Sequence, residues 1–228
     1  MRVPDVVFVK GERFSMGSEL GRPDEAPVHE VRLDAFQLGR TPVTNAEYAA
    51  CVAAGRVVEP PVWKDAAFSA EDRPVVGVSW FEASAYCAWL SEVTGASWRL
   101  PTEAEWECAA RGGLQSAPTP WGDSLPEGEV PAGPLAGPWS VARGRPNGFG
   151  LFDAGTIVHE WCADWYDAAY YAVSPASRPT GPDEGSRRSS RGGSWRHRVR
   201  WSPPAARSSL PPAFHYTDYG FRVLRSVD

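Results

Sequence analysis

The sequence predicts an α+β fold with few long elements and much ordered loop. Its 228 residues include 11 Trp alongside 22 Gly and 22 Pro. Large rings fill volume, whereas Gly and Pro mark turns, so this mixture predicts aromatic side chains wedged among short elements. Because 43% of the residues are hydrophobic, the chain can bury a sizeable core. We expect residues 1–228 to form a single domain.

The first elements along the chain are predicted to be strands. Residues 6–16 and 28–38 carry partly alternating apolar patterns with β-branched side chains, which favours strands at a sheet edge. The segment between them is a turn-rich loop. At the other end of the chain, residues 217–226 are predicted to form a short closing strand.

Three helices are predicted between these strands. Each has the same start signal, a Thr or Ser followed three residues later by Glu, which forms a capping box. The pairs are Thr44 with Glu47, Ser79 with Glu82, and Thr102 with Glu105, and the closing glycines are Gly55, Gly95 and Gly112. The sequence therefore predicts three helices that are capped at both ends.

Regular periodicity is lost after Gly112. Residues 118–150 hold many Pro and Gly with interspersed Trp, so about a hundred residues after this point are expected to be loop and short strand. Disorder is the alternative. The aromatic content speaks against it, because disordered segments are poor in aromatic residues.

Composition limits the function and the location. The net charge of −5 argues against a surface devoted to nucleic acid, and no run reaches the ~20 apolar residues of a membrane span. The first residues lack an apolar signal core, so we expect a cytoplasmic protein. The four cysteines, Cys51, Cys87, Cys108 and Cys162, contain no C-x-x-C pair. We expect them to be reduced and buried, without a zinc site or a disulfide framework.

Several ordered segments resemble the formylglycine-generating enzyme or sulfatase-modifying-factor family. They include FSMGS, RLPTEAEWE, NGFGLFD, RGGSW and YGFRVLR, and the resemblance runs from about Phe14 to Arg225. It implies a loop-rich α/β unit related to C-type lectins, with little regular secondary structure.

The copper chemistry of that family is not expected here. The resemblance implies a cysteine pair just after RGGS that binds copper, activates oxygen and converts a sulfatase cysteine to formylglycine. No cysteine follows Cys162, and His197, Ser202 and Pro204 stand in the corresponding region. Because Cu(I) selects thiolate and thioether ligands, we expect no formylglycine generation by this mechanism.

The resemblance also implies a calcium site. Asp153 and Glu160 occupy its side-chain positions, and the carbonyls of Thr156 and Val158 would complete a shell of the oxygen ligands that Ca²⁺ prefers. The turn departs from the family's pattern, because Thr156-Ile157 replaces Gly-Asn and His159 replaces a Trp. We expect one calcium at most. The alternative is that the two acids only stabilise a buried turn.

Histidines offer a different kind of metal site. Non-haem iron is bound by two His and a carboxylate, and the sequence provides His159 with Glu160, His197, His215 and Asp218. The sequence alone does not make them converge. His29 is expected to be structural. The chain has no phosphate-binding loop and no G-x-S-x-G elbow, which leaves kinase and hydrolase functions without a signature.

A basic, aromatic segment is the most distinctive candidate surface. Residues 187–209 hold seven Arg and no acid, and the resemblance implies that the segment from RGGS to GFR lines the ligand groove. The candidate contact residues are Trp195, Arg196, His197, Trp201, Arg207, His215, Tyr216 and Tyr219. Arg binds carboxylate or phosphate, and aromatic planes stack on rings or cations, which favours a peptide or a small anionic or aromatic ligand.

Other interpretations of this segment stay open. The chain has 21 Arg and only two Lys, so any single Arg says little about binding. The segment can therefore be an ordinary solvated face. Nucleic-acid binding, through Arg187, Arg188, Arg191, Arg196, Arg198 and Arg200, is disfavoured by the acidic total.

Two functional hypotheses follow, with the catalytic residues unassigned. The first is a ligand- or peptide-binding module without formylglycine-generating activity, of which a surface-display protein varying between Trp195 and Tyr219 is one form. The second is a divergent metal-dependent oxidoreductase, an oxygenase using histidine-bound iron or copper at the same groove.

Overall fold

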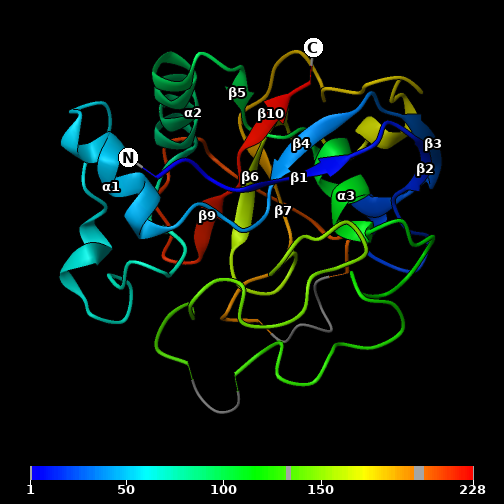
Figure 1. Ribbon diagram of the computed structural model, residues 1–228. Helices are drawn as coiled ribbons and strands as arrows, with labels where there is room; N and C mark the ends of the chain where they lie inside the picture. Colours follow the sequence, from blue (N-terminus) through cyan, green and yellow to red (C-terminus); the bar gives the residue numbers. More distant parts are fainter. Residues whose placement is uncertain (1, 132–134, 198–202, 228) are drawn as a thin grey trace.

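Short strands are linked by long loops (Figure 1). The computed structural model describes residues 2–131, 135–197 and 203–227. Within these residues the sheets have the orders β1-β4-β10-β5, β2-β3 and β8-β7-β6-β9. The strands are β1 (Val6–Val9), β2 (Arg13–Met16), β3 (His29–Arg32), β4 (Phe36–Gly39), β5 (Trp98–Arg99), β6 (His159–Trp165), β7 (Arg188–Arg191), β8 (Arg207–Leu210), β9 (Tyr219–Phe221) and β10 (Leu224–Ser226).

The three predicted helices are confirmed. They are α1 (Asn45–Ala53), α2 (Trp80–Thr94) and α3 (Glu103–Arg111), and each begins with a capping box in which both reciprocal hydrogen bonds are present. Gly95 and Gly112 end α2 and α3 in the left-handed conformation, with φ of 71° and 60°, which a residue with a Cβ rarely adopts. Three short 3-10 turns, η1 (Pro23–Glu25), η2 (Pro61–Lys64) and η3 (Tyr170–Ala172), complete the described helical elements.

The predicted strands are present but divided. Residues 6–16 form β1 and β2, and residues 28–38 contain β3 and most of β4. The predicted closing strand is wrong as a single element, because β9 belongs to one sheet and β10 to another. Arg222 lies between them with 1% exposure and pairs with Glu160 at 2.9 Å. The chain crosses between the sheets at this buried ion pair.

The loop prediction holds for the residues after α3. Between Gly112 and β6, the described residues form neither helix nor strand. Two buried side chains tie this stretch down. Asn147 donates hydrogen bonds to the carbonyls of Ala109 and Ala110 at the end of α3, and Trp139 is 7% exposed. The loop is therefore held by tertiary contacts rather than by repetitive backbone pairing.

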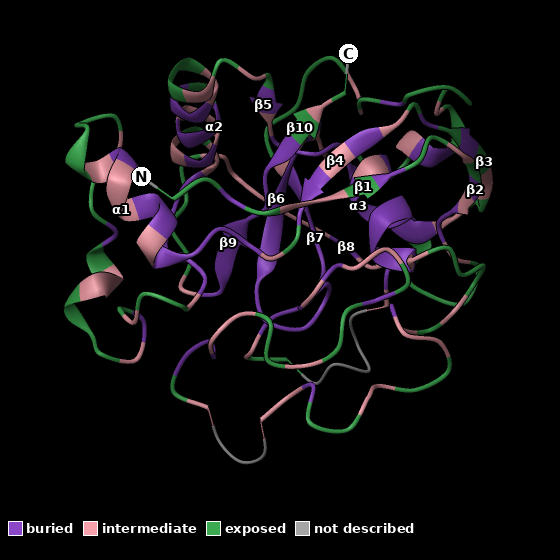
Figure 2. Ribbon diagram, viewed as in Figure 1, coloured by how far each residue is buried: buried purple, intermediate pink, exposed green. Residues whose placement is uncertain are grey.

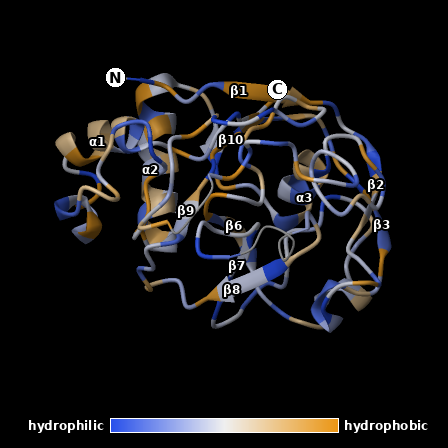
Figure 3. Cartoon of the chain, turned by 90° about the horizontal axis from the view of Figure 1, so that it is seen from below, coloured by the Kyte–Doolittle hydropathy of each residue, from blue (hydrophilic) through white to orange (hydrophobic). Residues whose placement is uncertain are grey.

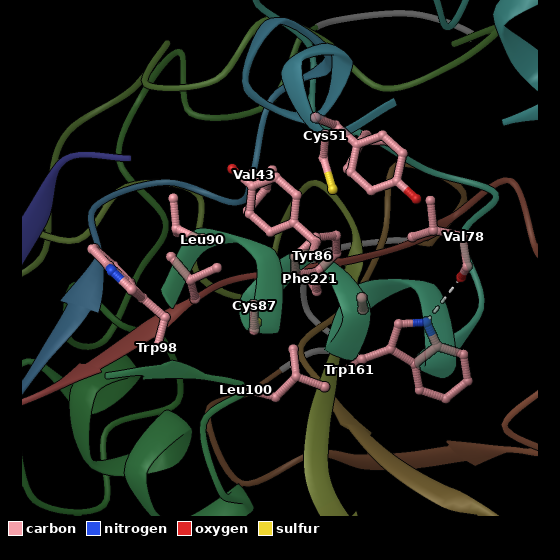
Figure 4. Packing of buried hydrophobic residues seen from close by; sticks show 14 of the residues in the cluster. Val43, Cys51, Val78, Tyr86, Cys87, Leu90, Trp98, Leu100, Trp161 and Phe221 are labelled. Carbon is pink, nitrogen blue, oxygen red and sulfur yellow. Dashed lines mark hydrogen bonds between the residues drawn. The ribbon is translucent and has the colours of Figure 1, made fainter. Parts of the chain in front are cut away.

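The largest hydrophobic cluster packs α1 and α2 against β9 and β6. Figure 4 shows Tyr86, Phe221 and Trp161 among its members, and the Trp161 indole donates to the carbonyl of Val78 at 3.0 Å. All four cysteines are free and buried, as expected. Burial raises the pKa of Cys87 and of Cys162, so these thiols stay protonated.

A buried charge network joins α3 to the third sheet. Glu103 and Glu107 of α3 bind Arg191 of β7, and Glu103 also binds Arg207 of β8 at 2.8 Å. The side chains of these four residues are at most 2% exposed. Figure 2 shows α3, β6 and β9 as largely buried, and Figure 3 shows β6, β7 and β8 next to one another. The network therefore anchors the end of β7 and the start of β8 against α3.

We expect Glu103→Gln to destabilise the protein by about 3 to 5 kcal/mol, because it leaves Arg207 buried without its carboxylate partner. Urea unfolding measures the change. Glu92→Gln is the matched control, since Glu92 is 55% exposed and pairs with Arg56 at the surface, where an ion pair contributes about 1 kcal/mol or less. Equal destabilisation by the two substitutions contradicts the assigned role of the network.

Candidate metal centre

Parallel pairing of β6 with β9 brings His159 next to Asp218. In the register of this pair, His159 faces Tyr219, and the His159 backbone N–H donates to the Asp218 carbonyl at 2.9 Å. The rings of His159 and Tyr219 lie 4.8 Å apart. Both ligand candidates are buried, with exposures of 7% for His159 and 6% for Asp218. The sheet thus positions an imidazole and a carboxylate that are far apart in the sequence.

His197 reaches the same place from the turn after β7. Gly192 has a φ of 78°, and its missing Cβ leaves room for Trp106, since a Cβ there would lie 3.2 Å from the indole. The chain then folds back, and the His197 N–H donates to the Ser194 carbonyl at 2.8 Å. The His197 ring meets the His159 ring edge to face at 5.0 Å. Unlike its two neighbours, His197 is exposed.

Three metal-ligating side chains converge here. One potential ligand atom from each of His159, His197 and Asp218 lies within 4.8 Å of the others. The Nδ1 atom of His159 and the Oδ1 atom of Asp218 are buried without a hydrogen-bond partner among the described residues. Leaving such atoms unpaired costs about 1 to 3 kcal/mol each. A cation bound between them would satisfy both.

The protonation states suit a cation at this cluster. Burial lowers the pKa of His159 to about 4, a shift that Asp218 and the Gly192 backbone oppose and that His197 reinforces. His159 is therefore neutral at pH 7, with a lone pair available to a metal. Asp218 is held by Ser194, whose Oγ donates to Oδ2 at 3.1 Å. Ser194 is therefore positioned to orient the carboxylate.

Two of the proposed metal ligands lie elsewhere. The Nε2 atom of His215 lies 2.9 Å from the Oε2 atom of Glu82, at the start of α2, and the His215 side chain is 45% exposed. Glu160 accepts hydrogen bonds from the Trp106 indole at 2.7 Å and from Arg222. Of the residues considered for iron, the structure brings together His159, His197 and Asp218.

A cavity of about 560 Å³ opens at the cluster. His159 and His197 line it together with Glu25 and the neighbouring loop, and Pro203 and Ala206 form part of its wall. A ligand in this cavity would lie beside the imidazoles. Since His197 is exposed, the cluster can be reached from solvent.

The predicted ligand-binding residues do not line one groove. Of those the structure describes, His197 and Arg207 line the cavity, but the Arg207 guanidinium is taken up by Glu103 and by backbone carbonyls. Trp195 packs on Phe68 with Arg196 over its ring. Trp201 lies outside the described residues, as do Arg198, Arg200 and Ser202.

The remaining members of that set occupy two different environments. Tyr219 is buried between His159 and Trp161, and its hydroxyl lies 2.9 Å from the Ser208 Oγ. Tyr216 is 43% exposed and stacks on Phe214, with ring centroids 6.1 Å apart. Tyr219 therefore packs against His159 inside the protein, and Tyr216 belongs to the outer surface.

The calcium prediction falls on a fully buried turn. Asp153 has a φ of 60°; its Oδ2 accepts from the Ala142 N–H at 2.7 Å, and its Oδ1 has no partner among the described residues. Burial raises its pKa to about 6. Thr156 and Val158 are buried as well. Glu160, however, holds Arg222, so a calcium ion here requires Glu160 to exchange the arginine for the cation.

Two residues of the site were not singled out by sequence reasoning. Ser194 stands in RGGSW and Glu25 stands between two strands in a turn-rich loop. The RGGSW segment resembles the family, but nothing in the local pattern of either segment assigns a role to the Ser194 or Glu25 side chain. A burial estimate would have been the signal for Glu25, because an acid with 2% exposure needs a partner.

The described residues form a loop-rich α+β fold of short strands and three α-helices. Residues 1–227 match the family described as sulfatase-modifying factor enzyme 1-like domain. The chain is 33% identical to the formylglycine-generating enzyme of Streptomyces coelicolor, over 100% of this chain and 89% of that protein. This chain therefore belongs to the sulfatase-modifying factor family, and the predicted fold class is confirmed.

Two further comparisons agree. The solved structure of PvdO from Pseudomonas aeruginosa superimposes with a TM-score of 0.85 at 26% identity, covering 98% of this chain and 95% of that one. The serine/threonine-protein kinase pkn1 of Chlamydia pneumoniae is 34% identical over 98% of this chain, which spans only 38% of that protein's length.

Among the described residues, no helix has the length and apolar character needed to cross a membrane.

Calcium at the Asp153 turn is testable by thermal unfolding. If the ion binds, calcium at a hundred times Kd stabilises the fold by about 2.7 kcal/mol, and Asp153→Asn loses most of this gain. Asp34→Asn serves as the control, because Asp34 is 66% exposed and pairs with Arg178 at the surface. An unchanged wild-type transition in calcium contradicts the prediction.

Proposed function

We propose that this chain is a metal-dependent oxidoreductase. It binds one divalent transition metal through His159, His197 and Asp218, and iron(II) is the first candidate for that metal. The observation that carries the proposal is the convergence of these ligand atoms within 4.8 Å, with two of the residues holding buried, unpartnered polar atoms. Two imidazoles and one carboxylate form the ligand set that non-haem iron(II) oxygenases use.

Three protein ligands favour a catalytic rather than a structural metal. Structural zinc sites take four protein ligands, whereas catalytic sites keep a position open. The cavity beside His159 and His197 gives a substrate access to that position. Iron bound here would supply one-electron and oxygen chemistry. The protein's part is to keep His159 neutral, to hold Asp218 through Ser194, and to confine the substrate next to the metal.

The departure from the family's copper chemistry supports the same proposal. The resemblance implies thiolate ligands just after RGGS, and in this chain that segment supplies His197 instead. Replacing sulfur by imidazole and carboxylate shifts the preference from Cu(I) toward iron(II), zinc or Cu(II). In this proposal, the metal centre keeps its place in the family's fold, while its ligands and its metal change.

A ligand- or peptide-binding module is the second candidate function, and an exposed aromatic pair favours it. Phe214 and Tyr216 are 46% and 43% exposed and stack on each other, and His215 stands between them in the chain. Stacked, exposed rings suit contact with a peptide or an aromatic ligand. This surface leads toward the candidate metal centre through Tyr219, whose ring is 6.1 Å from that of Tyr216.

Metal analysis tests the proposal. We expect the protein purified without chelator and supplied anaerobically with iron(II) to hold one equivalent of metal. His159→Ala and Asp218→Ala should each weaken metal binding by about a hundredfold or more, because each removes one of only three ligands. His215→Ala is the matched control and should retain wild-type affinity, since His215 contacts Glu82 instead.

Three results contradict the proposal: a wild-type protein that binds no better than His159→Ala, equal loss in His215→Ala, or stoichiometric metal that fails to bind nitric oxide as a surrogate for oxygen. The last result would favour the binding module. Circular dichroism of every variant verifies that the fold is retained.

Ser194→Ala is expected to weaken metal binding by about ten- to a hundredfold, because outer hydrogen-bond partners orient metal ligands to that extent. Isothermal titration with Co²⁺ measures the affinity. Ser208→Ala is the control, since Ser208 contacts Tyr219 rather than Asp218. An affinity for Co²⁺ that is unchanged in Ser194→Ala removes Ser194 from the site.

A further inference from the structure

Glu25 is a buried acid beside the candidate metal centre that the metal ligands do not explain. It ends η1, is 2% exposed, and lines the same cavity as His159 and His197. Its Oε2 atom is buried without a hydrogen-bond partner among the described residues. It is not a member of the three-residue ligand cluster. The cavity therefore has a buried carboxylate in its wall in addition to the two histidines.

Three other buried glutamates have arginine side chains as partners, and Glu25 does not. Glu103 binds Arg207, Glu107 binds Arg191 and Arg111, and Glu160 binds Arg222. Glu129, which is also buried with an unpartnered Oε1 atom, accepts the Arg145 backbone N–H. Burial raises the pKa of Glu25, and the charges of Asp24 and Glu107 add to this, whereas Arg191 and the Arg22 backbone oppose it.

The two buried arginines near the cavity have their terminal nitrogens engaged elsewhere. Arg207 bonds to Glu103 and to the carbonyls of Asp24 and Asp167. The terminal nitrogens of Arg191 bond to Glu107, to the Tyr171 hydroxyl and to the Pro204 carbonyl. Arg207 is thus not available to an anion in the cavity. Arg22, which also lines the cavity, is 67% exposed and pairs with Asp24. This differs from the anionic ligand that the arginine-rich sequence suggested.

The loop before Glu25 contacts both its backbone and its carboxylate. The Ser18 N–H donates to the Glu25 carbonyl at 2.9 Å. Gly21 also lines the cavity, and a Cβ on Gly21 would lie 1.9 Å from the Glu25 Oε2. The backbone at Gly21 thus lies directly against the carboxylate. A side chain there would displace it, so this position is built around the acid.

We infer that Glu25 binds a protonated amine on the molecule that occupies the metal cavity. The inference rests on the proposed function, because it places the amine-bearing ligand next to the metal. A buried carboxylate is best satisfied by a cationic donor, since charge-assisted hydrogen bonds are about twice as strong as neutral ones. Pro203 and Ala206 supply wall for an apolar body. The ligand class is a small primary amine, or an amine-bearing side chain, with an apolar or aromatic portion.

A pair of isosteric probes tests this inference. 2-Phenylethylamine is cationic at pH 7, and 2-phenylethanol has nearly the same shape without the charge. We expect the Co²⁺-loaded protein to bind the amine about ten- to a hundredfold more tightly than the alcohol, the range for a hydrogen bond to a charged group. Glu25→Gln should abolish this preference while leaving the affinity for Co²⁺ unchanged. Calorimetry measures probe binding, and the visible spectrum of Co²⁺ reports the metal.

Two further variants sharpen the test. Glu30→Gln removes the same charge from an exposed acid that pairs with Arg13, and it should keep the preference for the amine. Gly21→Ala retains Glu25 but displaces its carboxylate, so it should reduce the preference. If Glu25→Gln does not fold, Gly21→Ala decides the question.

The outcomes separate this inference from the proposed function. Normal Co²⁺ binding with no preference for the amine, or with a preference that survives both Glu25→Gln and Gly21→Ala, overturns the role of Glu25 and leaves the metal centre standing. Failure to bind Co²⁺ overturns the metal centre. In that case, the same probe pair applied to the metal-free protein still decides whether Glu25 recognises an amine.

Discussion

The position of the site depends on the buried carboxylates of α3. Glu103 and Glu107 each hold an arginine from the third sheet, and an unpaired charge at that depth costs several kcal/mol. The end of β7 and the start of β8 are therefore fixed relative to α3. The turn that carries Ser194 and His197 begins at Arg191, so the same ion pairs determine where this turn starts. Of the arginines that suggested a ligand-binding surface in the sequence, Arg191 and Arg207 belong to this network.

The second constraint is the parallel pairing of β6 with β9, which sets His159 against Asp218. A shift of one residue in this register would turn His159 to the other face of the sheet. Glu160, the next residue, points to Trp106 and Arg222 and locks the strand on that other side. One strand thus alternates between an ion pair that stabilises the fold and a histidine that faces the cavity. This alternation explains why Glu160 stabilises the fold, whereas the adjacent His159 lines the cavity.

Two chemically different kinds of unpaired polar group lie at the cavity. His159 and Asp218 present lone pairs that a metal would satisfy, and Glu25 presents a carboxylate oxygen that a hydrogen-bond donor would satisfy. These groups come from three distant segments, and each has a defined neighbour: Ser194 holds the Asp218 carboxylate, the Asp218 carbonyl holds the His159 backbone, and Gly21 lies against the Glu25 carboxylate. A family fold that is mostly loop can therefore position a site, because buried polar contacts give the loops the rigidity that regular hydrogen bonding gives to helices and strands.

The sequence by itself determined the elements whose signals are local. The three helices began at their capping boxes, because a Thr or Ser and a Glu three residues later interact within a single turn, and the loss of periodicity after Gly112 marked the loops. The quoted motifs also identified the family. The sequence named His159, His197 and Asp218 as metal candidates but equally named His215 and Glu160. Only the tertiary structure separated them, because the decision rests on strand pairing across 60 residues and on which buried charges find an arginine, and neither is encoded within a local window.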